Sequence, residues 1–193
     1  LGSAFSQVPN KDQAWEDLHS LTQDKYSYVR RNAAHAMGST FNLIPAKDQA
    51  WEDLHRLAQD EDKNVRWSAA HAMGSAFNLI SAKDQAWEDL HRLAQDNYSY
   101  VRCTSNHSLG RISILRATES DYEFRTCLEE AIEFFRRSSD EAKLFNPSSF
   151  CLPFYRSLHS LLFTEIPKDE EVQRYLSKAK EAIKTTESRE VLL

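Results

Sequence analysis

Residues that break helices are scarce in this chain. Its 193 residues include four glycines and five prolines, the two residue types that most disfavour a helix interior. No apolar run approaches the roughly 20 residues that a membrane-spanning helix needs, and no signal-peptide pattern is present. We therefore expect an all-helical protein with no membrane segment.

Cysteine and net charge are also low. The three cysteines, Cys103, Cys127 and Cys151, are odd in number and form no close pair, which favours reduced thiols and a cytoplasmic location. The formal net charge of −5 makes the chain a poor match for nucleic acid or an anionic membrane. We expect neither of these partners.

One nine-residue string dominates what is present. Lys-Asp-Gln-Ala-Trp-Glu-Asp-Leu-His occurs at 11–19, 47–55 and 83–91, at intervals of 36 residues. All four glycines keep the same interval, at Gly2, Gly38, Gly74 and Gly110. A fixed period of this length is typical of a solenoid of stacked supersecondary units.

Each repeat is predicted to contain two helices, about 12–23 and 27–43 in the first complete copy. The second helix has an apolar face with the spacing i, i+4, i+8 and i+12, formed by Val29, Ala33, Met37 and Phe41. Pro45 is expected to end that helix. The recurring glycine indicates either close approach of a neighbouring helix or a kink. Burial is expected for the tryptophans of the first helices, which are Trp15, Trp51 and Trp87.

The second helix also carries a family resemblance. Its pattern Val-Arg-x-x-Ala-Ala-x-Ala-Met-Gly, at 29–38, resembles HEAT repeats of the subtype called PBS-lyase HEAT-like. That subtype has an aspartate six residues before the arginine, and the matching pairs here are Asp24/Arg30, Asp60/Arg66 and Asp96/Arg102. Such pairs can cap the turn and, in stacked repeats, extend into a ladder of charge-assisted hydrogen bonds.

The resemblance implies a right-handed α-solenoid of two-helix repeats over residues 1–117. Its units are a partial repeat at 1–9 and complete repeats at about 10–45, 46–81 and 82–117. Because Leu1-Gly2-Ser3-Ala4-Phe5 matches the middle of a repeat, we expect the chain to be a fragment that further repeats precede.

The period is lost after Ala117, so residues 118–193 are expected to form an irregular helical cap that continues the solenoid. One helix is predicted over 119–138, and another starting at Asn146-Pro147 or Ser149. A third is predicted from Pro167, and a further one from Thr186. The helix pairs of this cap vaguely resemble tetratricopeptide units.

No catalytic residue, metal site or cofactor is expected. The histidines recur at equivalent positions of helices roughly 8–10 Å apart, too far to share one ion with bonds of about 2 Å. No histidine precedes a glutamate, as in HEAT-repeat iron hydroxylases. Glu16 and Asp17, with their copies, are adjacent on a helix and are expected to be solvated.

The remaining candidate is a binding surface. HEAT-family second helices line a concave face, and the matching positions here contain no acidic residue. Aromatic and basic residues on this surface favour protein contact; the alternative is an ordinary solvated face. The predicted surface comprises Tyr28, Arg31, His35, Lys63, Asn64, Trp67, His71, Tyr100, Cys103, His107 and Arg111. Trp67 is expected to be partly exposed.

Three functions follow from the resemblance. The first is a non-enzymatic scaffold that binds a protein or peptide, acidic or polar in character, in the concave groove. The second is a bilin lyase or chromophore chaperone, for which no residue here identifies a chromophore contact. The third is a HEAT-like nucleic-acid-binding module, against which the net acidity counts.

Overall fold

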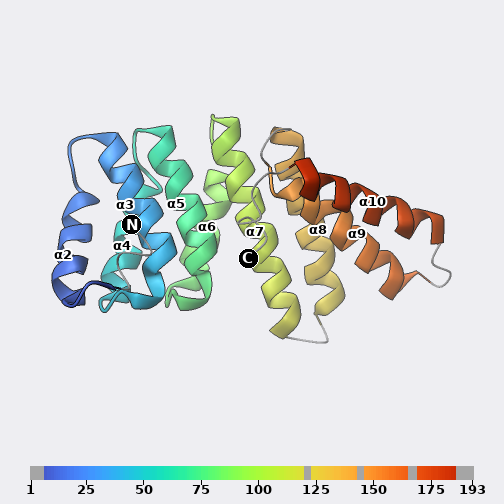
Figure 1. The fold of residues 1–193 in the computed structure, drawn as a ribbon, viewed down its shortest axis with the longest axis horizontal. Coiled ribbons are helices and arrows are strands. Elements are labelled where there is room, and N and C mark those ends of the chain that lie inside the picture. Colours follow the sequence, from blue (N-terminus) through green and yellow to red (C-terminus); the bar gives the residue numbers. More distant parts are fainter. Residues whose placement is uncertain (1–6, 120–122, 143–145, 165–168, 186–193) are drawn as a thin grey trace. The chain divides into compact units, whose positions relative to one another are not determined.

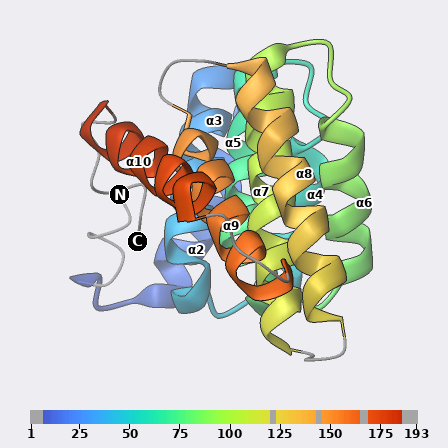
Figure 2. The same ribbon diagram turned by 90° about the vertical axis from the view of Figure 1, so that its right-hand side faces the viewer.

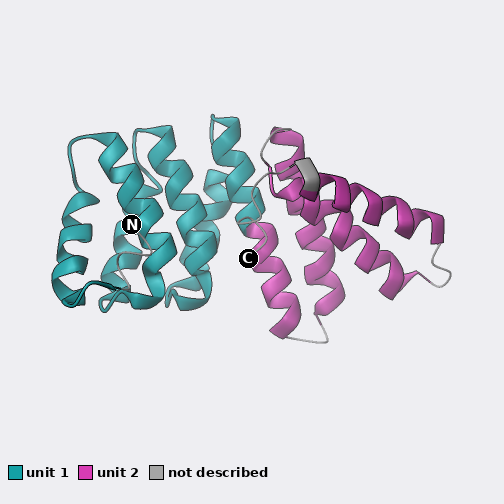
Figure 3. Cartoon of the chain, in the orientation of Figure 1, with its two compact units in different colours: residues 1–108 teal, residues 109–193 magenta. Residues whose placement is uncertain are grey.

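The computed structural model describes residues 7–119, 123–142, 146–164 and 169–185. Every regular element in these ranges is a helix, which confirms the all-helical prediction. The chain divides into two units, residues 1–108 and 109–193 (Figure 3). The division falls inside α7 (Ser99–Glu119), and the domain boundary expected after residue 117 stays a prediction.

The first unit is an α-solenoid of helix pairs, coloured from blue to green in Figure 1. Its elements are α2 (Lys11–Leu21), α3 (Ser27–Thr40), α4 (Lys47–Leu57), α5 (Lys63–Ala76), α6 (Lys83–Leu93) and the start of α7. The second helices α3 and α5 pack along each other, and α4 and α6 lie to one side of them (Figure 2). Equivalent helices begin 36 residues apart, as the repeated string predicts.

Local sequence sets the ends of these helices. The Asn10 side chain accepts a hydrogen bond of 3.1 Å from the Gln13 amide and caps α2. The short 3₁₀ turns η1 (Phe41–Leu43) and η2 (Phe77–Leu79) end α3 and α5. Pro45 is therefore not required, because α5 ends at the same repeat position with Ser81 in place of the proline. Both 3₁₀ turns have the sequence Phe-Asn-Leu, which α7 lacks.

The apolar faces of the second helices form the core of the first unit. Ala33, Met37 and Phe41 are at most 2% exposed, and their copies in α5 and η2 are also buried. In α7 the serine at the second position of this face, Ser105, is fully buried and donates a hydrogen bond to the Val101 carbonyl. That bond satisfies the hydroxyl, so a polar residue is tolerated in the core.

Glycine in the second helices permits close approach of the next second helix. A Cβ atom on Gly38 would lie 2.7 Å from the Cα atom of Ala72 in α5. A Cβ on Gly74 would lie 2.6 Å from the Cβ of Ser108 in α7. Of the two readings of the glycine pattern, close approach is the one confirmed.

The tryptophans of the first helices are not equally buried. Trp15 and Trp51 are 2% and 3% exposed, as predicted, and Trp67 is partly exposed, as predicted. Trp87 is of intermediate exposure, so it is less buried than its two copies. The repeated string has no further copy after α6, so no identical first helix packs against Trp87 as α4 does against Trp15.

The second unit contains α8 (Phe124–Glu141), α9 (Ser148–Phe163) and α10 (Asp169–Thr185), with α9 packed on both of the others. Asn146 joins α8 to α9: its amide donates to the Ser138 and Ala142 carbonyls and its carbonyl accepts from the Ser148 amide. The helix predicted over 119–138 has the wrong start, because α7 continues to Glu119 and α8 begins at Phe124. The predicted starts at Pro167 and Thr186 lie outside the described residues.

None of the described helices is both long enough and apolar enough to cross a lipid bilayer.

Candidate functional site

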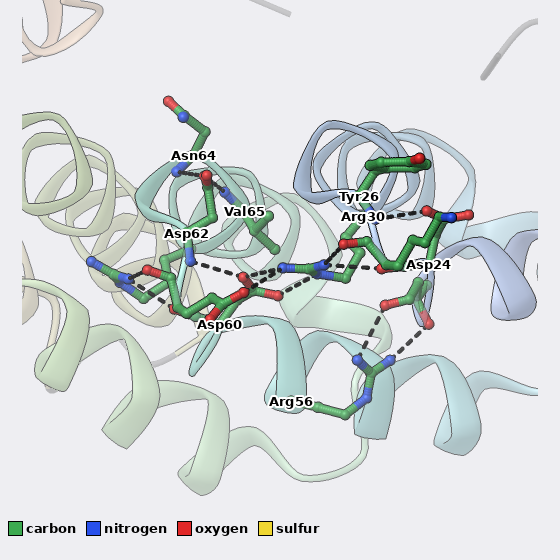
Figure 4. Close-up of polar contacts among 12 residues, drawn as sticks. Asp24, Tyr26, Arg30, Arg56, Asp60, Asp62, Asn64 and Val65 are labelled. Carbon is green, nitrogen blue, oxygen red and sulfur yellow. Dashed lines mark hydrogen bonds and ion pairs between the residues drawn. The ribbon is translucent and has the colours of Figure 1, made fainter.

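Arginine and aspartate side chains connect consecutive repeats at the turns between first and second helices (Figure 4). Arg30 in α3 donates to both carboxylate oxygens of Asp60, over 2.7 and 2.8 Å. Its third nitrogen, Nη1, donates to the Asp24 carbonyl over 2.9 Å. One guanidinium therefore caps its own turn and holds the turn of the next repeat.

The same contacts recur one repeat later. Arg66 donates to both oxygens of Asp96 over 2.7 and 3.1 Å, and to the Asp60 carbonyl over 2.8 Å. Arg102 donates to the Asp96 carbonyl over 2.7 Å. The structure thus brings together the six residues predicted as a ladder. We call this set, Asp24, Arg30, Asp60, Arg66, Asp96 and Arg102, the arginine–aspartate ladder.

The ladder is largely shielded from solvent. The Arg30 and Asp60 side chains are 11% and 9% accessible. The hydrogen bond with Asp60 raises the pKa of Arg30 above its ordinary value despite partial burial. Burial raises the pKa of Asp96, but hydrogen bonds from Arg66 and the Tyr98 amide outweigh it and leave the pKa below its ordinary value. Both groups are therefore charged at neutral pH.

A second set of polar contacts connects the first helices. His19 in α2 donates from Nδ1 to the Asp53 carboxylate in α4 over 2.5 Å, and Arg56 donates to the other oxygen of Asp53 over 2.9 Å. Arg56 also donates to the Thr22 carbonyl and hydroxyl, at the end of α2. The next repeat has the same histidine–aspartate–arginine contacts, formed by His55, Asp89 and Arg92.

These contacts correct the prediction for the paired acids. Asp53 and Asp89 are 4% and 5% exposed, whereas Asp17, at the same repeat position, is exposed. Burial of Asp53 and Asp89 is tolerated because each accepts hydrogen bonds from a histidine of the preceding repeat and from an arginine one turn later. The histidine lies 34 residues before its aspartate, a spacing that a search at 36 residues does not detect.

The histidine–aspartate pairs border a cleft of about 530 Å³ between α2 and α4, lined mainly by polar side chains. A histidine that a carboxylate holds in one orientation can serve as a metal ligand or a general base. Here, however, Nε2 of His19 is also engaged, by the amides of Gln23 and Gln49 over 3.1 and 3.3 Å. Both nitrogens of the ring thus have protein partners, which favours a structural role between repeats.

The predicted binding residues on α3, α5 and the start of α7 are mostly accessible. Tyr28 and Tyr100 are 60% and 68% exposed, and Trp67 is partly exposed. The rings of His35 and His71 stack with centroids 5.8 Å apart and an interplanar angle of 6°. We call this surface the second-helix face; it comprises Tyr28, Arg31, His35, Lys63, Asn64, Trp67, His71, Tyr100 and His107.

Two predicted members of the surface, Cys103 and Arg111, do not belong to the second-helix face. Cys103 is 6% exposed, so its prediction as a surface contact is wrong. Cysteine is shorter than Arg31 and Trp67, which occupy the same repeat position, and its thiol does not reach solvent. Arg111 is exposed, but it belongs to the second unit and is described apart from this face.

Two of the cysteines have thiols whose pKa is raised by burial. Burial raises the pKa of the Cys127 thiol and raises that of Cys151 to about 11, which leaves little thiolate at neutral pH. Among the described residues, no group of three or more histidine, cysteine or acidic side chains could hold a metal ion.

Comparison with known proteins identifies the repeats. The family model for HEAT repeats matches residues 16–110. No curated protein and no solved structure matches the chain. The matched stretch contains the arginine–aspartate ladder, the histidine–aspartate pairs and the whole second-helix face. Residues 16–110, just under half of the chain, therefore match the HEAT-repeat family.

Proposed function

We propose that this chain is a non-enzymatic scaffold that binds an acidic or polar protein segment along the second-helix face. HEAT repeats generally act as protein-interaction scaffolds. The observation that carries the proposal is the set of large aromatic side chains left exposed on this face. Tyr28, Trp67 and Tyr100 come from three successive second helices and are accessible in each case.

Exposed aromatics of this kind suit a protein partner. Tyrosine and tryptophan provide most of the binding energy in many interfaces, because they bury a large area at a small cost in conformational entropy. Tyr26 stacks on Tyr28 with centroids 5.6 Å apart, and Lys63 lies 4.5 Å from the centre of the Tyr98 ring. The first contact orients the Tyr28 ring before a partner binds, and the second positions Lys63, which belongs to the face.

The charge of the face favours acidic segments. Arg31 and Lys63 are exposed, and no acidic residue lies in the first turn of α3, α5 or α7. The amino ends of helices attract negative charge. The Asp62 carboxylate, which precedes α5, already accepts hydrogen bonds from the backbone amides of Asn64 and Val65. A partner's carboxylates would therefore meet attraction at the amino ends of α3 and α7 and at Arg31 and Lys63, whereas the exposed Glu61 lies before α5.

Two finer assignments belong to the same proposal. The aspartate six residues before each arginine supports the PBS-lyase HEAT-like subtype, and packed helix pairs in the second unit are compatible with a tetratricopeptide-like cap. Cys103, Cys127 and Cys151 form no disulfide with one another, which suits a cytoplasmic protein.

The test uses an acidic peptide as probe. A fluorescein-labelled peptide, chosen from a random library on the immobilised chain, is titrated by fluorescence anisotropy. We expect acidic sequences to be enriched, and Trp67→Ala to weaken binding by about tenfold or more, as for a central aromatic contact.

Leu79→Ala is the matched control. Leu79 is 42% exposed in η2 and lies outside the defined face, so its truncation should leave the dissociation constant unchanged. Selection of peptides without acidic residues would contradict the charge argument. Equal affinities of the wild type and Trp67→Ala would rule out the second-helix face as the binding surface.

A further inference from the structure

Helix α9, orange in Figure 1, exposes its large apolar side chains and buries small ones. The most exposed residues of this helix are Phe154, Leu161 and Leu162, at 38%, 51% and 53%. The buried residues are Ser148, Pro153, Ser157 and Ser160. A helix on the surface of a protein normally has the opposite arrangement, with its large apolar residues turned towards the core.

The neighbouring helix α8 has that normal arrangement. Its buried residues include Leu128, Phe134 and Phe135. Its exposed residues are all polar: Arg125, Thr126, Glu129, Arg137 and Asp140. Because α9 packs on both α8 and α10, its large apolar residues stay exposed although two helices already cover the rest of it. A cluster of exposed apolar residues of this kind marks an interaction site.

The exposed apolar residues lie on one side of the helix. Leu158, Leu161 and Leu162 follow Phe154 by four, seven and eight residues, a spacing that places all four together; we call them the α9 face. The 16 residues of α9 span about 24 Å, so a strip about 10 Å wide covers about 240 Å². A stable dimer buries about 800 Å² on each partner. The α9 face is therefore too small to hold a second copy of this chain by itself, and its size suits a single helix of a partner.

The charge at the edge of the α9 face is positive. Helix α9 contains no acidic residue. The exposed Arg111 of α7 counteracts the rise in pKa that burial causes at Cys151 and Tyr155, so its guanidinium lies near the first half of α9. The Tyr155 ring in turn contacts Phe154, with centroids 5.2 Å apart. The Glu129 carboxylate of α8 also reaches α9, but it pairs there with a histidine and with an arginine of its own helix.

We propose that the α9 face binds an amphipathic helix of a partner protein, in which carboxylates flank the apolar side. Apolar residues of that helix, spaced three or four apart, would contact Phe154, Leu158 and Leu161. Its carboxylates would meet the Arg111 guanidinium. Because the contact is small, we expect a dissociation constant in the micromolar range and rapid exchange. This inference does not depend on the proposed function, because α9 lies outside the second-helix face.

The probes are three fluorescein-labelled helical peptides that share leucines at intervals of three and four residues and carry glutamate, lysine or glutamine beside them. In anisotropy titrations we expect the glutamate peptide to bind about tenfold more tightly than the lysine peptide. Leu161→Ser should weaken its binding by about tenfold. Leu79→Ser is the matched control, because this leucine is 42% exposed in the first unit and should leave binding unchanged. Arg111→Gln should weaken the glutamate peptide alone and leave the glutamine peptide unaffected.

Four outcomes would overturn the proposal. The first is equal affinity of the wild type and Leu161→Ser for the glutamate peptide, with unchanged far-UV spectra. The second is equal affinity of the wild type for the glutamate and lysine peptides. The third is binding that Trp67→Ala abolishes and Leu161→Ser preserves, because the peptide would then lie on the second-helix face. The fourth is a dimer in sedimentation velocity that Leu161→Glu dissociates, because the α9 face would then bind a second copy of this chain.

Discussion

Replacing Asp60 by asparagine should destabilise the protein far more than the same change at Asp24. The two aspartates occupy one repeat position, and each accepts a backbone amide two residues ahead. Only Asp60 also receives two hydrogen bonds from an arginine of the preceding repeat, over 2.7 and 2.8 Å. Asp24→Asn is therefore an internal control for the loss of the carboxylate itself.

The expected magnitude follows from burial. Arg30 and Asp60 are 11% and 9% accessible, so Asp60→Asn leaves a largely desolvated guanidinium whose remaining ion-pair partner is the exposed Glu61 carboxylate, 3.8 Å away. Removing one partner of a buried pair costs about 3 kcal/mol at the lower end of measured values. For a chain of this length that corresponds to a fall in melting temperature of about 6–12 °C. Asp24→Asn, which affects one hydrogen bond, should cost about 1 kcal/mol or less.

Circular dichroism at 222 nm during thermal unfolding measures both effects, and urea unfolding checks them against the free energy. Unchanged far-UV spectra before melting would show that each variant keeps its helices. If Asp60→Asn and Asp24→Asn lowered the melting temperature equally, the contact between repeats would contribute nothing, and the reasoning about the ladder would be wrong.

Three further predictions follow from the fold. Trp51→Ala should cost about 3–5 kcal/mol in urea unfolding, because Trp51 is 3% exposed, and Trp67→Ala should cost clearly less; similar costs would contradict the two environments. Gly38→Val should lower the melting temperature, because its side chain would overlap the Ala72 backbone, whereas Ser39→Val at an exposed position should not. Because the pKa of Asp96 is lowered in the folded state, its stabilisation is complete above the ordinary carboxyl pKa of about 4 and is lost as pH falls through the lower folded value. Urea midpoints measured between pH 6 and 2.5 should therefore fall less steeply for Asp96→Asn than for the wild type, and parallel curves would contradict this.

Much of the first unit could be predicted from the sequence because it repeats. The interval of 36 residues located the helix pairs, and the apolar spacing of Ala33 and Met37 identified the buried face. Mid-helix glycine was informative for the same reason, since Gly38 and Gly74 recur at equivalent contacts with the next helix.

Contacts that cross between repeats were harder to predict. Asp53 and His19 are 34 residues apart, so comparison of equivalent positions could not pair them. The offset depends on how the first helices are rotated and shifted against each other. Asp53 consequently looks like a solvated acid in the sequence, although it is buried and paired. Cys103 was predicted on the surface but is buried, because its position on the helix does not reveal how far a short side chain reaches towards solvent.

The binding surface is tested most directly by the indole N–H signals of the four tryptophans. In ¹H–¹⁵N spectra recorded during titration with the selected acidic peptide, we expect the signal of Trp67 to shift in proportion to binding. The signals of Trp15 and Trp51, which are buried in the first helices, should stay in place. A shift of Trp15 or Trp51 with Trp67 unchanged would place the peptide on the first helices and contradict binding at the second-helix face.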